Sequence, residues 1–480
     1  MTHINLNRKN CQVLVVGGGP GGYVAAIRAG QLGLDVILVE GDKVGGTCLI
    51  RGCIPSKALI HAASKFEDIK HIAISETGNL GISLSAAPKL DLAKTYEWKE
   101  SVVNQLNSGV ETLLKKAGVQ VVHGWAKFRN AKTCVVTSKD ADGAVLEFKI
   151  TAEHIILANG SSIVELPFLP FDDKVINSTQ ALDLKTLPKK LAVIGAGYIG
   201  LELGIAYAKL GSEVTFIEAG NHILPTFDSE LTRPIANWLK THDIAVNLNS
   251  KAAGLDPHGA LRFENADGKI ETIEADKILV TVGRKANLEG WGLEHMGVEL
   301  DTHNRFIKVD DRCHTSMRNV WAIGDLIGEP MLAHKASAQG ELVAEIIAGQ
   351  KRKFSQTAIA AICFTEPEII SIGLSPKDAK ANNIEVKVGK FPLAANGRAL
   401  SQQIGKEGGF VRVVARADNH LIIGIQAVGP HISEMSGEFA LALEMGARLE
   451  DIADTIHVHP TLNESFMESA MAALGHAVHI

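Results

Sequence analysis

The sequence predicts an α/β protein with two Rossmann-like dinucleotide-binding domains followed by a C-terminal α+β domain. A strand, a glycine-rich turn, a helix and a second strand that ends in an acid occur near the N-terminus and again from residue 191. After residue 356, apolar strands and helical stretches continue without a phosphate-binding loop. With 480 residues, the chain is also too long for one hydrophobic core.

The first copy of the repeated unit begins with the apolar run VLVV and continues through GGGPGG into a helical pattern. Gly17 permits the tight turn, Gly19 lets a pyrophosphate approach the backbone, and Gly22 lets the helix pack on the strand. The helix N-terminus offers free N–H groups to phosphates. The following strand, DVILVE, ends at Glu40, 21 residues after Gly19, where a carboxylate would bind ribose hydroxyls.

The second copy is LAVIGAGYIGLELGIAYAKLGSEVTFIE, residues 191–218. Its glycines are Gly195, Gly197 and Gly200, and its acid is Glu218. One G-x-G-x-x-G is weak evidence, but two complete copies predict two cofactors, FAD and a nicotinamide nucleotide. Because AGNHIL follows Glu218 without an Arg to receive a 2′-phosphate, NAD is favoured over NADP.

Two cysteines, Cys48 and Cys53, lie five positions apart in GGTCLIRGCIPSK. On an ideal α-helix their side chains would diverge by roughly 140° and their Cα atoms would lie roughly 8–9 Å apart. A disulfide needs less than about 7 Å, so the pair requires a distorted helix start, which the glycines and the proline favour. A helix N-terminus would also lower the pKa of a thiol.

A redox-active dithiol is the favoured interpretation of Cys48 and Cys53. Two buried unpaired thiols or half of a metal site are the alternatives, but no second ligand pair accompanies them, and no metal site is expected. The other cysteines lie in or beside strand-like runs and are expected to be buried small hydrophobes: Cys11, Cys134, Cys313 and Cys363.

Charge and hydropathy exclude several classes of protein. The net charge is −6 and the basic residues are scattered, so no stripe for nucleic acid or an anionic membrane is expected. Apolar runs are too short for a signal peptide core or a membrane span. These features predict a cytoplasmic location.

The chain resembles the flavoprotein disulfide reductases from end to end, in the branch that oxidises dihydrolipoamide with NAD. GGTCLIRGCIPSK resembles the active-site segment of that family. The resemblance implies that Cys48 is the interchange thiol that meets the substrate and that Cys53 is the thiol beside the flavin. It also implies that Lys57 approaches flavin N5 and pairs with Glu202, which would tune the flavin electronically.

Further segments carry the same resemblance. WAIGDLIGEPMLAHKA resembles the second FAD-binding stretch, in which Asp325 would bond the ribitol chain and a helix beginning near Met331 would point its N-terminus at the flavin. TVGRKAN resembles the strand and turn that lead into this stretch. The resemblance adds Gly124 and Ala333 to the expected FAD site and Gly283 to the NAD and flavin edge.

The segment HVHPTLNE contains a candidate acid/base pair, His459 and Glu464. Pro460 can start a helix, which predicts His459 at the helix entrance and Glu464 about one turn inside. A carboxylate on one ring nitrogen raises the basicity of the other. A His near a Glu is more often only a satisfied pair, but the resemblance implies that His459 deprotonates the substrate thiol and Glu464 orients it. His457 would only support the interface.

The resemblance implies a homodimer in which His459 reaches the disulfide of the partner subunit. The other implied partners are the lipoyl domain and the acyltransferase subunit of a 2-oxoacid dehydrogenase complex. GGTCLIRGCIPSKALIH and ALGHAVHI resemble bacterial forms that serve branched-chain complexes. The expected domains are 1–160 (first part of the FAD-binding domain), 161–280 (NAD-binding), 281–355 (central, completing the FAD site) and 356–480 (dimerisation).

Two alternatives remain beside this reading: another flavoprotein disulfide reductase, of the glutathione reductase type, and a non-catalytic redox-sensing flavoprotein. The first usually carries an Arg-bearing NADPH site, which is missing after Glu218. A non-catalytic flavoprotein would lack one or more of the catalytic candidates, and all four are present: Cys48, Cys53, His459 and Glu464. The chain departs from the family at ILANGSS, where Asn159 replaces a usual Thr, and Tyr198 is a candidate cover for the nicotinamide face of the flavin.

Overall fold

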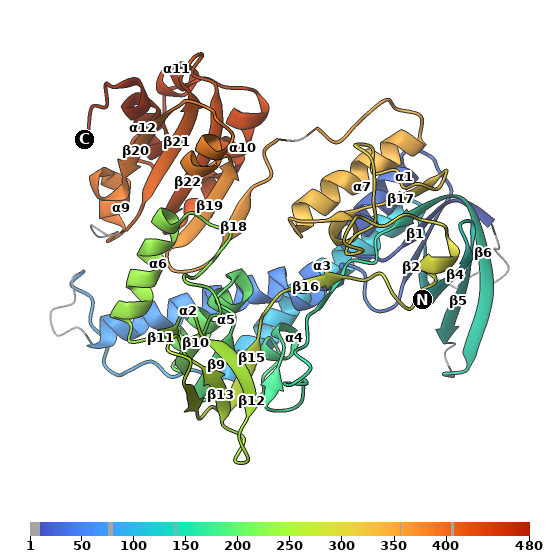
Figure 1. The fold of residues 1–480 in the computed structure, drawn as a ribbon, viewed down its shortest axis with the longest axis horizontal. Helices are drawn as coiled ribbons and strands as arrows, with labels where there is room; N and C mark the ends of the chain where they lie inside the picture. Colours follow the sequence, from blue (N-terminus) through green and yellow to red (C-terminus); the bar gives the residue numbers. More distant parts are fainter. Residues whose placement is uncertain (1–9, 75–79, 140–141, 356, 405–407) are drawn as a thin grey trace. The chain divides into compact units, whose positions relative to one another are not determined.

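The computed structural model describes residues 10–74, 80–139, 142–355, 357–404 and 408–480. The chain divides into two compact units, each built from separate stretches of sequence (Figure 1). The first unit takes its residues from 1–59, 91–164 and 283–355, and the second from 60–90, 165–282 and 356–480.

The first unit is built on a mixed β-sheet. Its strands, in sheet order, are β3 (Gln120–His123), β2 (Val36–Glu40), β1 (Asn10–Val16), β6 (Val145–Leu157), β5 (Thr133–Lys139) and β4 (Trp125–Asn130). β17 (Val320–Ala322) pairs in parallel with the end of β6. β3, β2, β1 and β6 run parallel, whereas β6, β5 and β4 form an antiparallel meander. The carboxyl ends of the parallel strands are where a doubly wound sheet binds its ligands.

Alternate residues of β1 enter two different hydrophobic clusters. Val13 and Val15 pack into one cluster with Val36, and Leu14 packs into the other with Ile37. A strand that is apolar on both faces is typical of a parallel sheet covered on both sides.

Helices α1 (Pro20–Gln31) and α7 (Ala333–Ile347) lie side by side (Figure 1). A Cβ on Gly340 would lie 2.3 Å from the Gly21 carbonyl oxygen, so the helices approach at glycine. The remaining elements of this unit are α3 (Leu92–Lys116), β7 (Ser161–Ile163), β16 (Arg284–Ala286), and the short turns η2 (Leu293–His295) and η3 (Gly324–Ile327). The 22-residue helix α2 (Cys53–Ile74) begins in this unit and continues in the second.

A buried carboxylate joins α1 to α7. Glu345 is 4% exposed and accepts from Arg28 Nη2 at 2.6 Å and Nε at 3.0 Å. Arg352 forms a second ion pair with the same carboxylate. Burial raises the pKa of Glu345, but the bonds from both guanidinium groups outweigh burial and hold the pKa below its usual value.

We expect Glu345→Gln to lower the free energy of unfolding by about 1–2 kcal/mol at pH 7, because the two partly exposed guanidinium groups would lose their counter-charge. A carboxylate with a depressed pKa contributes stability above the unfolded pKa of about 4.3 and loses it as the pH falls. Denaturant unfolding should therefore show a larger difference between the variant and the parent at pH 7 than at pH 3. Glu341→Gln, an exposed site on the same helix, is the matched control. An equal loss at both pH values would contradict the ionic explanation.

The second unit contains the second dinucleotide-binding sheet. Its parallel strands, in order, are β11 (Ala245–Asn247), β10 (Glu213–Ile217), β9 (Lys190–Ile194), β15 (Lys277–Val280) and β8 (Val175–Ile176). Its helices are α4 (Ser178–Ala181), α5 (Tyr198–Leu210) and α6 (Ser229–Thr241). An antiparallel sheet adjoins it, made of β12 (Lys251–Leu255), β13 (Leu261–Glu264) and β14 (Ile270–Ile273).

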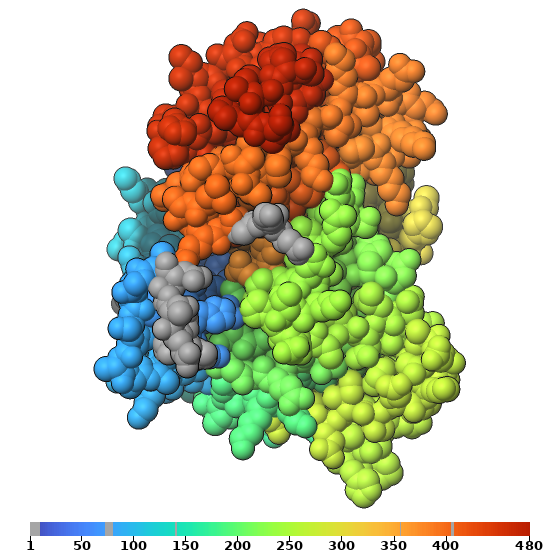
Figure 2. Space-filling model, turned by 90° about the vertical axis from the view of Figure 1, so that its left-hand side faces the viewer, coloured from blue at the N-terminus to red at the C-terminus, as the bar shows by residue number. Residues whose placement is uncertain are grey.

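The C-terminal part of the second unit, coloured orange to red in Figure 2, is an α+β fold on an antiparallel sheet. Its strands, in order, are β18 (Ala361–Cys363), β19 (Glu368–Gly373), β22 (Ile422–Gly429), β21 (Phe410–Arg416) and β20 (Val386–Pro392). The helical segments are α8 (Pro376–Ala381), η4 (Leu393–Ala395), α9 (Gly397–Ser401), η5 (Ile432–Met435), α10 (Ser436–Glu444), α11 (Leu449–Ala453) and α12 (Glu464–Leu474). The predicted strands FVRVVA and HLIIGIQAVG are β21 and β22.

Within the second unit, α6 is tied to this C-terminal sheet by a buried Arg. Arg412 on β21 is 3% exposed and donates to Glu230 Oε2 at 2.8 Å and Asp228 Oδ2 at 3.1 Å. Its Nε donates to Gln426 Oε1 at 2.9 Å. The paired Arg therefore anchors α6 against β21.

The four non-redox cysteines are buried, as predicted, with exposures of 7% or less: Cys11, Cys134, Cys313 and Cys363. Within the described residues, no helix combines the length and the apolar composition that a membrane span requires.

Candidate active site

The first glycine-rich turn has the backbone geometry that the sequence predicts. Gly17 has a φ of +99°, and a Cβ there would lie 2.3 Å from the Ala158 carbonyl oxygen. A Cβ on Gly22 would lie 1.8 Å from the Gly17 carbonyl oxygen. In contrast, a Cβ on Gly19 would meet only Gly46 Cα, at 4.0 Å. The turn is therefore crowded on its protein side and open beside Gly19, as a pyrophosphate site requires.

Glu40 lies at the end of β2 with its carboxylate turned back to this turn. Gly18 N–H donates to Oε2 at 2.6 Å, and Asp42 N–H donates to Oε1 at 2.8 Å. Burial raises the pKa of Glu40, while the backbone bond from Gly18 and the positive charge of Arg51 oppose the rise. The backbone N–H of Gly124 bonds the Glu40 carbonyl oxygen at 2.8 Å, so the structure brings the predicted Gly124 beside the predicted acid.

The second turn repeats this geometry. Gly195 has a φ of +97°, and a Cβ on Gly200 would lie 2.1 Å from the Gly195 carbonyl oxygen. Ala196 N–H donates to Glu218 Oε2 at 2.7 Å, and Gly220 N–H donates to Oε1 at 2.6 Å. Each predicted acid therefore accepts one backbone N–H from its glycine-rich turn and one from the residue two positions after the acid.

We expect Gly197→Ala to raise the KM for NAD by at least about tenfold without changing Tm, because the second glycine lets the pyrophosphate reach the backbone. A Cβ on Gly197 would have no protein atom within 4 Å, so the fold has room for it. Steady-state kinetics and thermal unfolding measure the two effects. Gly200→Ala is the comparison variant and should lower Tm, because its Cβ would overlap backbone. An unchanged KM in Gly197→Ala would contradict the assignment.

Cys48 and Cys53 lie on a distorted helix start, as the sequence predicts. Residues Thr47–Arg51 form a π-helix, η1, and Gly52 separates it from α2, which begins at Cys53. A π-helix bonds residue i to residue i+5, so it brings residues five apart onto one side, whereas an α-helix turns them away. A side-chain hydrogen bond links Cys48 with Cys53, so the two thiols lie close together.

The neighbouring sulfur determines the protonation of Cys48. Its hydrogen bond with Cys53 raises the pKa of the Cys48 thiol, burial raises it further, and the positive charge of Lys57 opposes the rise. The expected lowering of a thiol pKa by the helix therefore does not apply to Cys48. Two thiols that share a proton favour one thiolate at a time.

The second FAD-binding stretch has a buried polar framework. Ser161 Oγ donates to Asp325 Oδ2, and Arg284 Nε donates to Ser161 Oγ at 2.8 Å. Gln339 Oε1 accepts from Gly324 N–H at 2.9 Å. Helix α7 begins at Ala333, two residues later than predicted, so Ala333 lies in its first turn. Sequence reasoning missed Ser161, Arg284 and Gln339, because nothing local distinguishes them from ordinary polar residues.

Asn159 supplies a test of whether a flavin nucleotide fits the first unit. Its backbone carbonyl accepts from Asn287 Nδ2 at 2.9 Å, but its side-chain oxygen is buried without a hydrogen-bond partner. A buried acceptor of this kind calls for a donor from a ligand or water. Together with the open side of the Gly19 turn, it makes the residues of this site fit a bound FAD.

Glu202 is 4% exposed on α5 and accepts from Phe364 N–H at 2.9 Å. Tyr198 is the first residue of α5 and its side chain is 43% exposed, and Gly283 has a φ of +127° just before β16. Lys57 belongs to the first unit and Glu202 to the second, and their pairing stays a prediction.

The predicted acid/base pair is formed. His459 Nδ1 lies 2.8 Å from Glu464 Oε1, and the other carboxylate oxygen accepts from Thr461 N–H at 2.8 Å. Burial raises the pKa of Glu464, but these two bonds outweigh burial and keep the pKa below its usual value. The imidazole is 79% exposed, so Nε2 is open to a substrate or a partner subunit.

The predicted helix start at Pro460 is wrong, because α12 begins at Glu464. The Glu464 carboxylate bonds the N–H of Thr461, so the intervening residues form a turn closed by the carboxylate instead of a first helical turn. Glu464 is thus the first helical residue and not one turn inside.

Glu438 on α10 holds both ends of the loop that carries His459, and sequence reasoning missed it. Its Oε1 lies 2.9 Å from His457 Nε2, and its Oε2 accepts from Asn463 Nδ2. The bond to Glu438 is the main reason that the pKa of His457 is raised. His457 therefore positions the loop and is turned away from the open side.

Large apolar side chains are exposed around this loop. Ile456 is 95% and Val458 73% exposed, and on α10 Leu441 is 61% and Met445 76% exposed. Apolar exposure of this extent marks a surface that a partner covers.

Comparisons with known proteins agree with this geometry. Residues 11–340 match the family model described as pyridine nucleotide-disulphide oxidoreductase, and residues 359–470 match its dimerisation domain. The chain is 55% identical over 468 residues to a dihydrolipoyl dehydrogenase of Pseudomonas aeruginosa, covering 98% of each chain. It is 45% identical to one of Geobacillus stearothermophilus, covering 98% of this chain and 97% of the relative. The solved structure of LpdA from Mycobacterium tuberculosis matches with a TM-score of 0.85 at 27% identity, covering 96% of this chain and 99% of that one.

Proposed function

Since the chain belongs to the pyridine nucleotide-disulphide oxidoreductase family, we propose that Cys48 and Cys53 are its redox-active pair. The chain is an FAD-dependent enzyme of the dihydrolipoamide dehydrogenase type, which oxidises dihydrolipoamide with NAD. The observation that supports the pair most directly is the π-helix that places the two sulfurs together.

The thiol chemistry follows from the arrangement of these groups. Nε2 of His459 takes the proton of one substrate thiol, and the resulting thiolate attacks Cys48 of the Cys48–Cys53 disulfide. The disulfide bond breaks, Cys53 leaves as a thiolate, and a mixed disulfide forms. The second substrate thiol, also deprotonated, attacks the substrate sulfur of the mixed disulfide, and Cys48 leaves as a thiolate. Lipoamide is released, and the protein disulfide has been reduced to a dithiol by two electrons, with the two substrate protons passing to the protein.

Several residues would hold the cofactors. Glu40 and the turn at Gly19 would bind the adenosine and pyrophosphate of FAD, and Asp325 its ribitol chain. Glu218 and the turn at Gly197 would bind NAD. FAD supplies the oxidant that returns the dithiol to a disulfide and the hydride that reduces NAD. Lys57 and Glu202 would pair at its reactive edge, and Tyr198 would exclude water from the nicotinamide face until NAD binds.

A homodimer completes the proposed site. The dimerisation domain and the exposed apolar side chains around His459 support this assembly. In it, His459 acts on the disulfide of the partner subunit, and Glu464 orients the imidazole. We further propose a cytoplasmic location and service to a 2-oxoacid dehydrogenase complex through its lipoyl domain and acyltransferase subunit, with the branched-chain type as the first to test.

NADH formation by the purified holoenzyme tests the function. Rapid turnover with dihydrolipoamide and NAD, and at least about a hundredfold lower kcat/KM with NADP, is the expected result, because Glu218 would repel a 2′-phosphate. Oxidised glutathione with NADPH is the rival pair of reactants. Faster oxidation of NADPH by oxidised glutathione would replace the proposal with a reductase of the glutathione reductase type, and no NADH formation although flavin is bound would favour the non-catalytic alternative.

A further inference from the structure

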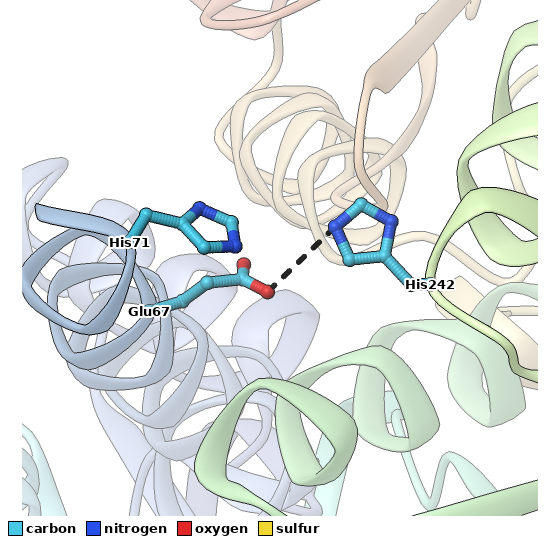
Figure 3. Close-up of side chains that lie close together, drawn as sticks. All are labelled: Glu67, His71 and His242. Carbon is cyan, nitrogen blue, oxygen red and sulfur yellow. Dashed lines mark ion pairs between the residues drawn. The ribbon is translucent and has the colours of Figure 1, made fainter. Parts of the chain in front are cut away.

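The second unit contains a Glu–His–His cluster away from the redox residues. Glu67 and His71 are four residues apart on α2, so they lie one above the other on one face of that helix. His242 is the C-cap residue of α6. Their ligating atoms all lie within 4.8 Å of one another, although the residues are far apart in sequence. Figure 3 shows the carboxylate and the two rings turned toward a common space.

The ring of His242 is fixed in the form that a metal ion requires. Its Nδ1 lies 2.8 Å from the Trp238 carbonyl oxygen, which can only accept, so Nδ1 carries the proton and Nε2 keeps a lone pair. Trp238 also stacks on the ring, with centroids 3.9 Å apart and 20° between the planes. A metal-bound His almost always donates its other N–H to a carbonyl or carboxylate in this way.

The spacing leaves room for an ion between the side chains. His242 Nε2 lies 4.0 Å from Glu67 Oε1, which is too far for a hydrogen bond. Tetrahedral zinc with bonds of about 2.0–2.2 Å places its ligand atoms roughly 3.3 Å apart. The ligating atoms already lie within 4.8 Å of one another, and the exposed ring of His71 can rotate to bring its nitrogen closer.

The surrounding charge is compatible with a divalent cation. Lys209 Nζ lies 3.4 Å from Glu67 Oε2 and pairs more closely with Glu366, at 2.7 Å. One Lys cation beside two carboxylates leaves a net charge of −1 next to the two imidazoles. Two nitrogens and one carboxylate oxygen suit Zn²⁺, with the fourth position left to water.

We propose that Glu67, His71 and His242 bind a zinc-class divalent cation that clamps α2 to the end of α6. Helix α2 begins at Cys53, and Glu67 lies 14 residues later, about 21 Å along the helix axis. The ion is therefore remote from the thiol chemistry and acts on the stability of the second unit.

Calorimetric titration with Zn²⁺ tests the site. The holoenzyme should carry Cys48→Ser and Cys53→Ser, so that the redox thiols cannot bind the metal. One equivalent should bind with a Kd of at most about 10 µM and raise Tm. His71→Gln, at the most exposed ligand, and His242→Gln should each weaken Zn²⁺ binding by at least about tenfold. Mutation of a residue that only hydrogen-bonds to a metal ligand already lowers metal affinity by about that factor. His295→Gln, an exposed His in the first unit, is the matched control and should bind like the parent.

Co²⁺ provides a second readout. Its visible bands, at wavelengths beyond the flavin absorption, should report nitrogen and oxygen ligands in the parent and disappear in His71→Gln. Equal Zn²⁺ binding by the parent and both His variants would overturn the proposal, because the ion would then lie elsewhere. Millimolar binding only, or none, would overturn it as well.

Discussion

Cys48→Ser is expected to lower dihydrolipoamide-dependent NADH formation by about 10⁴-fold or more, the scale of losing a covalent nucleophile or its target. A serine cannot form the mixed disulfide, and no substitute is available, because Cys53 then has no disulfide partner and the four remaining cysteines are at most 7% exposed. The variant should keep its fold, since Cys48 is only partly buried on η1 and a hydroxyl is only slightly smaller than a thiol.

The reaction of NADH with ferricyanide separates loss of chemistry from loss of cofactor. It needs the flavin and the NAD site but no dithiol, so Cys48→Ser should retain it within about twofold. Cys11→Ala, which removes a thiol from β1, is the matched control and should keep both activities. Retained dihydrolipoamide oxidation in Cys48→Ser would show that the exchange thiol has been misassigned.

His459→Gln should lower kcat/KM for dihydrolipoamide by about 10²–10⁴-fold at pH 7, the usual worth of a general base. The deficit should shrink as the pH rises, because the substrate thiol then ionises without help from the protein. A stopped-flow or steady-state pH profile of the variant and the parent measures how the ratio of their rates changes with pH. A merely structural defect would lower the rate by the same factor at every pH.

Two further variants test the hydrogen bonds around His459. Glu464→Gln keeps an acceptor for Nδ1 but loses the charge, so its deficit should be smaller than that of His459→Gln. His457→Gln is the matched control, because His457 is bonded to Glu438 and should cost less than about tenfold. A larger loss for His457→Gln than for His459→Gln would reverse the roles of the two imidazoles.

The sequence alone predicted the features that depend on residues close together in the chain. Both glycine-rich turns, the two terminal acids and the β21–β22 pair of strands lie where the pattern predicted them, because a strand–turn–helix unit is determined by neighbouring residues. The distorted start of the cysteine helix was also predictable, since an α-helix cannot bring residues five apart together.

Residues joined by tertiary contacts were not predictable in the same way. Glu438 holds the His459 loop from 19 and 25 residues away, and Gln339 reaches Gly324 across 15. The same limit applies to Glu67 and His242, which become neighbours only when α2 and α6 fold together. The helix start at Glu464 was missed for a local reason, since a carboxylate can close a turn as readily as it can cap a helix.

The way in which Glu40 and Glu218 are held bears on how this protein can evolve. Their carboxylates are fixed by backbone amides, and the donors differ between the copies: Gly18 and Asp42 in one, Ala196 and Gly220 in the other. Asp42 and Ala196 already carry side chains, so any substitution there except proline keeps the amide and its bond. A Cβ at Gly18 or Gly220 would lie 3.0 Å from the carboxylate oxygen that the amide binds, so those two donors are more restricted to glycine. The two copies can therefore differ in sequence at one donor of each pair while each keeps its acid in the same place.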